Sequence, residues 1–317
     1  MGLQTVAFLA ALVVATLTLA SGKPPFPKPS SEVFDDLLAR KIQENAKRGG
    51  NVHGHIVAVN DASRLIKSQD SDDDIPLTED IEEANEEANV DLFEGDILLP
   101  DDEDKEEEED MSQSEGSKRN IIKNKNRLWS TVVPYYVSPK LGYMNAKINK
   151  AVNELQTKTC VRFKKVSSGY NGDHIRLVKG RGCSSSVGRQ GGGQKLNLGA
   201  GCNYAGVVIH EIMHSLGVWH EQSRQDRDKY VEILWNNIKR GRSKNFRKYS
   251  HGMLDTLNLP YDTSSIMHYD RFLFSIDPGR KPTIIARGIP WKKLGGQLRG
   301  TLTANDVSEI NSLFKCT

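Results

Sequence analysis

Residues 210–228 of this 317-residue chain read HEIMHSLGVWHEQSRQDRD, and the first five of them decide how the fold is organised. His210 and His214 are four residues apart, so on a helix their imidazoles lie one above the other and can bind a single metal ion. Glu211 follows the first histidine directly and points off that face. Its carboxylate is therefore placed to reach a water molecule on the metal rather than the metal itself.

A third histidine extends this pattern. Gly217 follows His214 by three residues and takes a positive φ without steric cost, so it ends the helix and turns the chain sharply. The turn lets His220 return as a third nitrogen ligand. Three protein ligands and one water molecule form the catalytic type of zinc site, whereas a fourth side chain closes a structural site. The complete pattern, H-E-x-x-H-x-x-G-x-x-H, is the metzincin signature and predicts one Zn²⁺ ion per chain.

Among the metzincins, one family resembles this chain closely. The residues that resemble the extended astacin signature after the third histidine are Glu221, Arg224, Asp226, Arg227 and Asp228. Residues 265–269, Ser-Ile-Met-His-Tyr, resemble the astacin Met-turn, and the resemblance covers roughly residues 128–316. It implies an α+β, zincin-like metzincin fold with two lobes separated by an active-site cleft. The first lobe would hold a mixed twisted sheet and helices, and a mostly irregular second lobe would end in a helix.

The resemblance also implies roles for single residues. Glu211 would be the catalytic base, and Tyr269 would be an additional zinc ligand in the resting enzyme that stabilises the oxyanion during catalysis. Met267 would pack as a core residue beneath the zinc ligands. Glu221 would make a buried, water-bridged contact with the new α-amino group of Asn120 once the chain has been processed.

The first 22 residues carry an apolar run from Val6 to Ala20 that ends in small residues. The run is short for a membrane span and is typical of a secretory signal peptide. No later stretch is apolar enough to span a bilayer. We therefore predict a signal peptide at 1–22 and a secreted, extracellular protein.

Residues 23–119 differ sharply in charge from the remainder. They hold 28 acidic and 11 basic residues, a net charge of −17, whereas residues 120–317 hold 13 acidic and 32 basic residues, a net charge of +19. The nearly all-acidic run at 101–110 cannot bury itself. The region ends at the dibasic pair Lys118-Arg119, which is typical of a processing site. These features predict an acidic propeptide at 23–119, an activating protease that cuts after Arg119, and an astacin-like peptidase domain at 120–317.

The resemblance reaches into this propeptide. Residues 93–96, Phe-Glu-Gly-Asp, match the astacin prosegment pattern F-x-G-D. The match implies that Asp96 binds the zinc in the latent form and that the propeptide is an intramolecular inhibitor. A carboxylate oxygen is a competent zinc ligand and would displace the catalytic water. The alternative is a propeptide that only blocks the cleft sterically.

Four cysteines lie in the peptidase region, and in a secreted chain they predict two disulfides. Four cysteines allow three pairings, and the sequence does not choose among them. The resemblance implies the pairs Cys160–Cys316 and Cys183–Cys202.

Apolar periodicity and turn residues predict the secondary structure. Strands are expected at 131–137, 161–166, 174–178 and 195–198, with a turn or bulge at 191–193. Helices are expected at 31–46, 145–157, 203–215 and 302–314, with Asn145 and Thr303 as the N-caps of the second and the last. Residues 230–236 and 237–248 are expected to include short helices, and residues 249–302 are rich in turn formers.

Together these features predict a zinc metalloendopeptidase that acts on proteins or peptides. The positive charge of residues 120–317 should attract acidic substrates. Astacins often favour an acidic residue directly after the cut bond, and Arg299 is our candidate for its partner. We expect no nucleic-acid partner. The alternative is a catalytically inactive, metal-stabilised, secreted binding module, but such a module needs neither Glu211 nor Tyr269.

Overall fold

The computed structural model describes Glu82, Asn85 and residues 92–99, 127–248 and 259–316. Five predicted features therefore lie outside the described residues: the signal peptide, the helix at 31–46, the acidic run at 101–110, the Lys118-Arg119 site and Asn120. In the part of the chain that is described, no helix combines the length and apolar character needed to cross a membrane.

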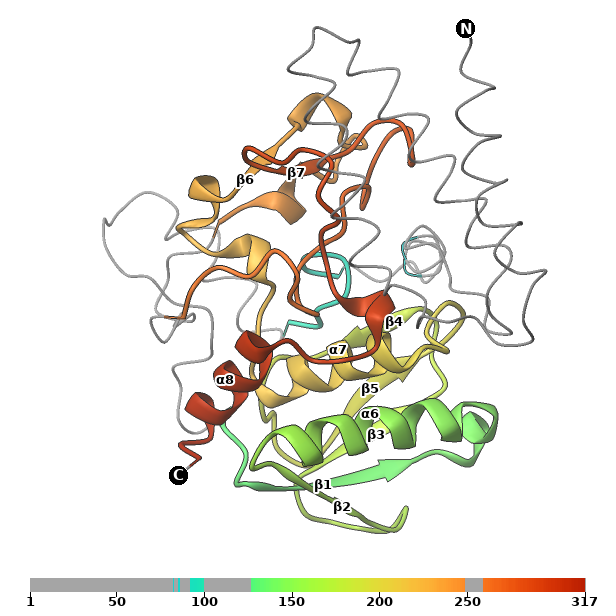
Figure 1. Ribbon diagram of the computed structural model, residues 1–317. Coiled ribbons are helices and arrows are strands. Elements are labelled where there is room, and N and C mark those ends of the chain that lie inside the picture. Colours follow the sequence, from blue (N-terminus) through green and yellow to red (C-terminus); the bar gives the residue numbers. More distant parts are fainter. Residues whose placement is uncertain (1–81, 83–84, 86–91, 100–126, 249–258, 317) are drawn as a thin grey trace, which may run out of the picture. The chain divides into compact units, whose positions relative to one another are not determined.

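A five-stranded sheet forms the first half of the peptidase region (Figure 1). Its strands are β1 (Val132–Val137), β2 (Arg162–Lys165), β3 (His174–Val178), β4 (Cys183–Ser185) and β5 (Gly193–Leu198). They lie in the order β2-β1-β3-β5-β4. The first four strands in this order are mutually parallel, and β4 runs antiparallel to β5 at the edge. The sheet is therefore mixed, as predicted, and β4 has one edge free of the sheet's own strands.

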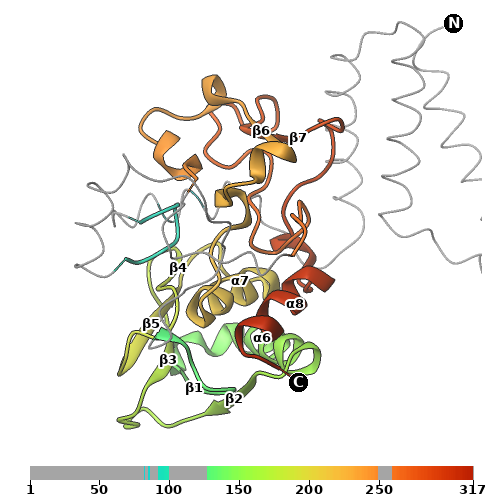
Figure 2. The ribbon, with the colours of Figure 1, turned by 90° about the vertical axis from the view of Figure 1, so that its left-hand side faces the viewer.

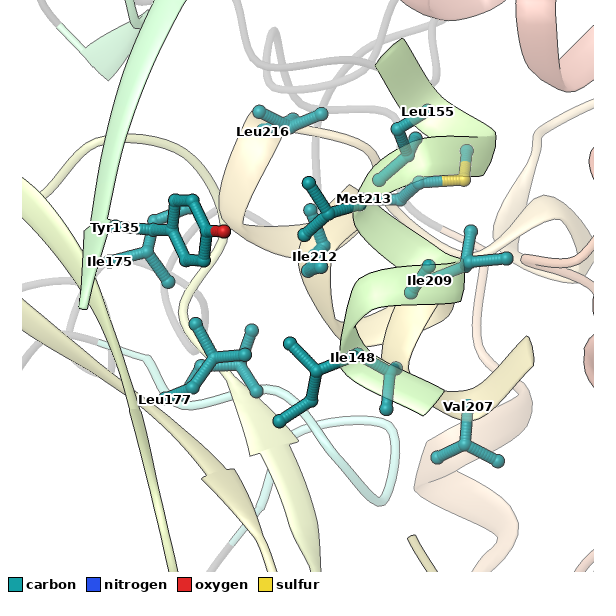
Figure 3. Packing of buried hydrophobic residues seen from close by; sticks show 14 of the residues in the cluster. Tyr135, Ile148, Leu155, Ile175, Leu177, Val207, Ile209, Ile212, Met213 and Leu216 are labelled. Atoms are coloured by element: carbon teal, nitrogen blue, oxygen red, sulfur yellow. The ribbon is translucent and has the colours of Figure 1, made fainter. Parts of the chain in front are cut away.

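Two helices, α6 (Asn145–Lys158) and α7 (Ala205–Leu216), lie on the same side of this sheet (Figure 2). The apolar residues of α6 recur every three or four positions and are buried, whereas α7 is buried along its whole length. Figure 3 shows Ile148 of α6 and Ile212 of α7 in one cluster with Leu177 of β3. The first two histidines of the pattern therefore sit on a helix that is buried along its whole length and packed on the main hydrophobic core.

The second half is mostly irregular, as predicted. Its short 3₁₀ helices are η4 (Glu221–Ser223), η5 (Arg227–Lys229), η6 (Trp235–Asn237), η7 (Ser243–Phe246) and η8 (Gln297–Arg299). It also contains the two-stranded sheet of β6 (Val231–Ile233) and β7 (Ile284–Ala286), and it ends in α8 (Ala304–Leu313). A second hydrophobic cluster, which includes Phe246, Tyr269 and Phe274, is the core of this half. The two clusters match the two lobes that were predicted.

Several local predictions differ from the structure. Asn145 is the first residue of α6 rather than its N-cap, because the 3₁₀ helix η3 (Pro139–Met144) runs directly into α6 and makes Met144 the cap. The helix predicted at 230–236 is wrong at its start, where β6 forms. There Val231 and Ile233 are buried while Glu232 between them is exposed, which is the alternation of a strand. Gly193 begins β5, so the predicted glycine turn is limited to the two residues before it. The three-residue strands β4 and β7 were not predicted.

The last helix is fixed to the first half of the region. Thr303 is its N-cap, as predicted, and forms a capping box with Asp306. The disulfides join Cys160 to Cys316 and Cys183 to Cys202, the pairing that the resemblance implies. The first disulfide connects the end of α8 to the segment between α6 and β2, and the second connects β4 to the start of the α7 region.

Candidate metal centre

The helix α7 and the turn after it bring the three predicted histidines together. His210 and His214 lie one turn apart on α7, and both are fully buried. Gly217 ends the helix with φ of 113°, a left-handed conformation that glycine adopts without a Cβ clash. His220 then turns back toward the helix, and its Nε2 lies 3.3 Å from that of His210. The Nε2 atoms of His210 and His214 are 3.0 Å apart.

Each histidine uses its other ring nitrogen for a hydrogen bond. The Nδ1–H of His210 donates to the carbonyl oxygen of Ile266 at 2.8 Å, and that of His214 donates to Val218 at 2.8 Å. The Nδ1–H of His220 donates to the carboxylate of Glu94 at 2.7 Å. Because these acceptors can only accept, Nδ1 of each ring carries a proton, and Nε2 is the nitrogen whose lone pair is available to a metal once it has lost its own proton.

Asp96 meets the three histidines. Its Oδ2 lies 3.1 Å from Nε2 of His210 and 3.3 Å from Nε2 of His220, and its Oδ1 lies 3.5 Å from Nε2 of His214. One ligand atom from each of these four residues lies within 4.8 Å of the others. Oδ1 of Asp96 is buried without a hydrogen-bond partner among the described residues, so the carboxylate is not satisfied by protein donors alone. Three lone pairs and a carboxylate that converge in this way fit one Zn²⁺ ion.

A tight turn carries Asp96 into this position. Phe93 and Ile97 exchange backbone hydrogen bonds of 2.9 and 3.0 Å across it. Gly95, inside the turn, has φ of +89°, and a Cβ there would lie 2.6 Å from the ring of Phe274. Glycine therefore satisfies both the backbone conformation and the close approach, and this explains the third residue of the F-x-G-D pattern.

The edge of the main sheet holds the same segment (Figure 1, teal). Ile97 pairs with Ser185 of β4 in a parallel bridge. The backbone N–H of Leu98 donates to the carbonyl oxygen of Ser185 at 3.0 Å, and the backbone N–H of Ser185 donates to the carbonyl oxygen of Asp96 at 3.0 Å. The side-chain amide of Asn85 bonds both backbone groups of Cys183. It accepts from the N–H at 2.6 Å and donates to the carbonyl oxygen at 3.0 Å. The segment thus pairs with the outer edge of β4 through a single β-bridge.

Burial and charge shift the pKa values of this cluster. Although burial opposes ionisation, the charge of His220 and hydrogen bonds from the three histidines hold the pKa of Asp96 well below its usual value of 3.8. Burial, followed by the charge of His210, lowers the pKa of His214 to about 4. His214 is therefore neutral at physiological pH and able to bind a metal, while the carboxylate opposite it is ionised.

Glu211 lies on the adjacent turn of α7 and is almost completely buried. Its Oε2 has no hydrogen-bond partner among the described residues. Burial, and then the negative charge of Asp96, raise its pKa well above 4.5. A buried carboxylate beside a metal position, with a free oxygen and a raised pKa, has the properties of a general acid–base group.

A model of the astacin family of peptidases matches residues 121–315. The chain belongs to the astacin family. Human meprin A subunit beta is 40% identical to it over 258 residues, which cover 80% of this chain and 34% of the meprin subunit. Zinc metalloproteinase nas-4 of Caenorhabditis elegans is 37% identical over 227 residues, 70% of this chain and 69% of that protein. The chain thus spans about a third of the length of the meprin subunit it matches.

Solved structures lead to the same family. High choriolytic enzyme 1, a hatching enzyme zinc-protease from Oryzias latipes, superposes on this astacin with a TM-score of 0.57. The two sequences are 38% identical, and the match covers 62% of this chain and 100% of the other. The matched fold is the zincin-like fold that the resemblance to astacins implied.

The Met-turn of this astacin lies beneath the histidines. Met267 is fully buried in the main core, and the preceding residue, Ile266, supplies the acceptor for His210. The ring of Tyr269 lies 4.9 Å from that of His220, centroid to centroid, and its hydroxyl donates to the carbonyl oxygen of Glu94. The Tyr269 hydroxyl is therefore engaged by a peptide carbonyl of the segment that carries Asp96.

Two predicted site residues lie away from the metal position. Glu221 is buried, pairs with Arg224 at 3.1 Å and accepts the backbone N–H of Asp262 at 2.7 Å. Arg299, on η8, is exposed and donates to the carbonyl oxygen of Ser264. Neither belongs to the group of converging ligands.

The sequence patterns missed three residues upstream of the peptidase region that contact it, Glu82, Asn85 and Glu94. Glu94 bonds both His220 and the hydroxyl of Ser223, yet in the sequence it is one acid among many. Glu82 is buried, with its carboxylate 2.7 Å from Nζ of Lys239 and 2.9 Å from the backbone nitrogen of Phe274. Asn85 lies three residues later. Their spacing of three was the one available signal, and it indicates only a shared helix face.

Proposed function

We propose that this astacin is a secreted zinc endopeptidase that hydrolyses peptide bonds in proteins and is made as a zymogen. The observation that carries the proposal is the convergence of three histidine Nε2 atoms beside buried Glu211, with Asp96 of the upstream segment seated among them. Lone pairs and a neighbouring base are what peptide hydrolysis needs, and the seated carboxylate occupies the position where a water molecule would bind.

The catalytic work of the protein falls to Glu211 and Tyr269. Bound zinc would supply a Lewis acid that lowers the pKa of a water molecule. Glu211 accepts the proton of that water and returns it to the leaving amine. Tyr269 donates a hydrogen bond to the oxyanion. Its contact with the Glu94 carbonyl supports this role, because the hydroxyl already faces a peptide oxygen next to the metal position. In the processed enzyme, without the Glu94 carbonyl, the Tyr269 hydroxyl would be available as an additional zinc ligand.

The propeptide keeps the precursor latent in two ways. Asp96 takes the ligand position, and its negative charge adds to burial in raising the pKa of Glu211, which favours the protonated form that cannot act as a base. The contacts of Glu82 and Asn85 hold the segment at two further points, on the second half and on the edge of β4. These contacts support inhibition through specific side-chain interactions rather than through steric blockage of the cleft alone.

Cleavage after Arg119 would also create a partner for Glu221. A small cavity beside Glu221 is lined by four carboxylates and one guanidinium, those of Glu221, Asp262, Asp306, Glu309 and Arg224. Burial raises the pKa of Glu221 to about 7, even though Arg224 opposes the shift. A cavity with surplus carboxylates fits a cation, so we assign it to the α-amino group of Asn120 in the processed chain.

The substrates that fit best are acidic proteins. The net charge of +19 on residues 120–317 attracts them at long range, although salt screens this attraction. Arg299 is exposed and is assigned to an acidic side chain directly after the cut bond. The predicted signal peptide supports a reaction outside the cell.

The test compares the full chain before and after a trypsin-like protease cuts at Lys118-Arg119, with mass spectrometry to define the new N-terminus. A fluorogenic protein substrate should be hydrolysed only after the cut, and a zinc chelator should abolish the activity. The double variant Lys118→Gln, Arg119→Gln is the matched control and should remain uncut and inactive. A cut chain that holds zinc and hydrolyses nothing, or an equally active uncut control, would contradict the proposal.

A further inference from the structure

The Met-turn is attached to the last helix through one buried side chain. The carboxylate of Asp306 accepts a hydrogen bond from the hydroxyl of Ser265 at 2.6 Å on Oδ1, and from the backbone N–H of Ile266 at 3.2 Å on Oδ2. Asp306 is only 1% exposed. Burying a carboxylate is costly unless its oxygens are satisfied, so these two donors are part of what keeps Asp306 inside the protein.

Helix capping accounts for only part of this arrangement. As a member of the capping box, Asp306 accepts the backbone N–H of Thr303 at 2.8 Å and donates its own N–H to the Thr303 hydroxyl at 3.0 Å. A capping box needs one carboxylate oxygen and leaves the other to solvent. Here both oxygens also hold the Met-turn, so the side chain joins two structures that are about forty residues apart.

The helix that carries Asp306 is a fixed support. Its end is joined to the first half of the region by the Cys160–Cys316 disulfide. Its side chain Asn311 accepts the backbone N–H of Cys160 at 3.1 Å. At its start, Glu154 of α6 accepts the backbone N–H of Leu302 at 2.9 Å. The position of Asp306 is therefore set by contacts made far from the metal position.

The Met-turn residue held by Asp306 also contacts the proposed zinc ligand His210. The N–H of Ile266 is held by Asp306, while the carbonyl oxygen of the same residue accepts the Nδ1–H of His210 at 2.8 Å. That bond fixes the ring orientation that directs Nε2 toward the ligand cluster. The ring of His214 is instead fixed by Val218, four residues later on the same segment. A displacement of the Met-turn should therefore act first on His210.

We propose that Asp306 is a positioning residue for zinc binding, which holds the Ile266 carbonyl against His210 and thereby links the last helix to the metal. Ser265 shares this task, because its hydroxyl donates to Asp306 and accepts the N–H of Met267 at 3.0 Å. The inference rests on the proposed zinc function, but it concerns the affinity for the metal and not the reaction.

The test measures zinc affinity and the absorption spectrum of bound cobalt(II) on the full chain with Asp306→Asn. The amide nitrogen cannot accept a hydrogen bond, so the side chain can no longer accept from the Ser265 hydroxyl and from the two backbone N–H groups at once. We expect zinc to bind roughly 10–100-fold more weakly, the usual cost of losing an outer partner of a ligand, together with a changed cobalt spectrum.

The matched control is Thr303→Val, which removes the capping hydroxyl at the same helix start and makes no contact with the Met-turn. It should lower the unfolding temperature while zinc affinity and the cobalt spectrum stay as in the wild type. If Asp306→Asn does not fold, Ser265→Ala gives the answer with a smaller change, and zinc should again bind more weakly than in Thr303→Val.

Two results would overturn the inference. One is wild-type zinc affinity and cobalt spectrum in folded Asp306→Asn, or in Ser265→Ala where that variant replaces it. The other is an equal loss in Thr303→Val, which would show that Asp306 acts only through helix stability. Because zinc and cobalt binding are measured directly, a wild-type chain that binds zinc without hydrolysing peptides would contradict the proposed function and leave this test intact.

Discussion

His210, His214 and His220 come from eleven consecutive residues, whereas Asp96, which meets them, lies 114 positions before His210 in the chain. The three histidines are brought together by helical spacing and by one glycine, and the ring of His214 is also fixed by a backbone acceptor four residues later. Asp96 is placed by a tight turn, the edge of β4 and side chains of the second half. Two of the histidines thus lie on a buried helix and the third follows its end, whereas Asp96 depends on contacts with distant parts of the chain.

The largest effect on activity is expected for a residue within the histidine segment itself. In the processed chain, Glu211→Gln should lower the rate of protein hydrolysis by about 10²–10⁴-fold, because the amide cannot take a proton from water. Zinc content should not change, since Glu211 lies outside the group of converging ligands. Metal analysis and turnover on one preparation check both statements. The control, His214→Gln, should lose zinc as well as activity, and unimpaired turnover in Glu211→Gln would remove it from the mechanism.

The next largest effect is expected for Asp96, which reaches the histidines from a distant part of the sequence. In a precursor that cannot be cut after Arg119, Asp96→Asn should raise the activity by at least about tenfold, which corresponds to about 1.4 kcal/mol of lost inhibition. The amide keeps the shape of the side chain but loses the charge that favours the metal position. A fluorogenic peptide assay with intact-mass control measures this. Glu232→Gln, an exposed acid on β6, is the charge-matched control. A precursor as inert as its parent would favour a steric plug.

A third prediction uses Glu221, which is adjacent to His220 in sequence but depends on a distant amine. Burial raises its pKa in the precursor to about 7 from an ordinary value of 4.5, so the folded state binds more protons than the unfolded state between these pH values. The stability of the precursor relative to its Glu221→Gln variant should therefore fall as the pH rises from about 4.5 to about 7. Urea unfolding of both proteins across this range measures the difference.

Processing should reduce this dependence on pH. The α-amino group of Asn120 favours the ionised carboxylate, so it would lower the pKa of Glu221 in the cut chain. The same urea series on cut and uncut protein tests the assignment of the cavity. An identical pH dependence before and after the cut would show that the amine binds elsewhere.

The smallest effect concerns Arg299. Arg299→Ala should reduce the preference for Asp or Glu directly after the cut bond by about two- to fivefold, because exposed ion pairs are worth only about 0.2–1 kcal/mol. A peptide library at low and high salt measures the preference, and salt should diminish it. Arg287→Ala, at an exposed arginine after β7, is the control for loss of one positive charge. An unchanged library profile would remove Arg299 from the substrate site.

The spacing of His210, Glu211, His214, Gly217 and His220 determined the metal site, because ligands separated by one or two helical turns need no distant contact to meet. Apolar periodicity was likewise sufficient to predict the helices α6, α7 and α8, because the pattern of a long segment still indicates a helix when single positions deviate from it. The tertiary structure decided the features that depend on pairs far apart. It chose one of three disulfide pairings and made a strand of Val231–Ile233, whose partner β7 lies some fifty residues later. It also decided the hydrogen-bond partners of Glu94 and Asp306. No pattern in the sequence indicates which distant donor will bond a given carboxylate.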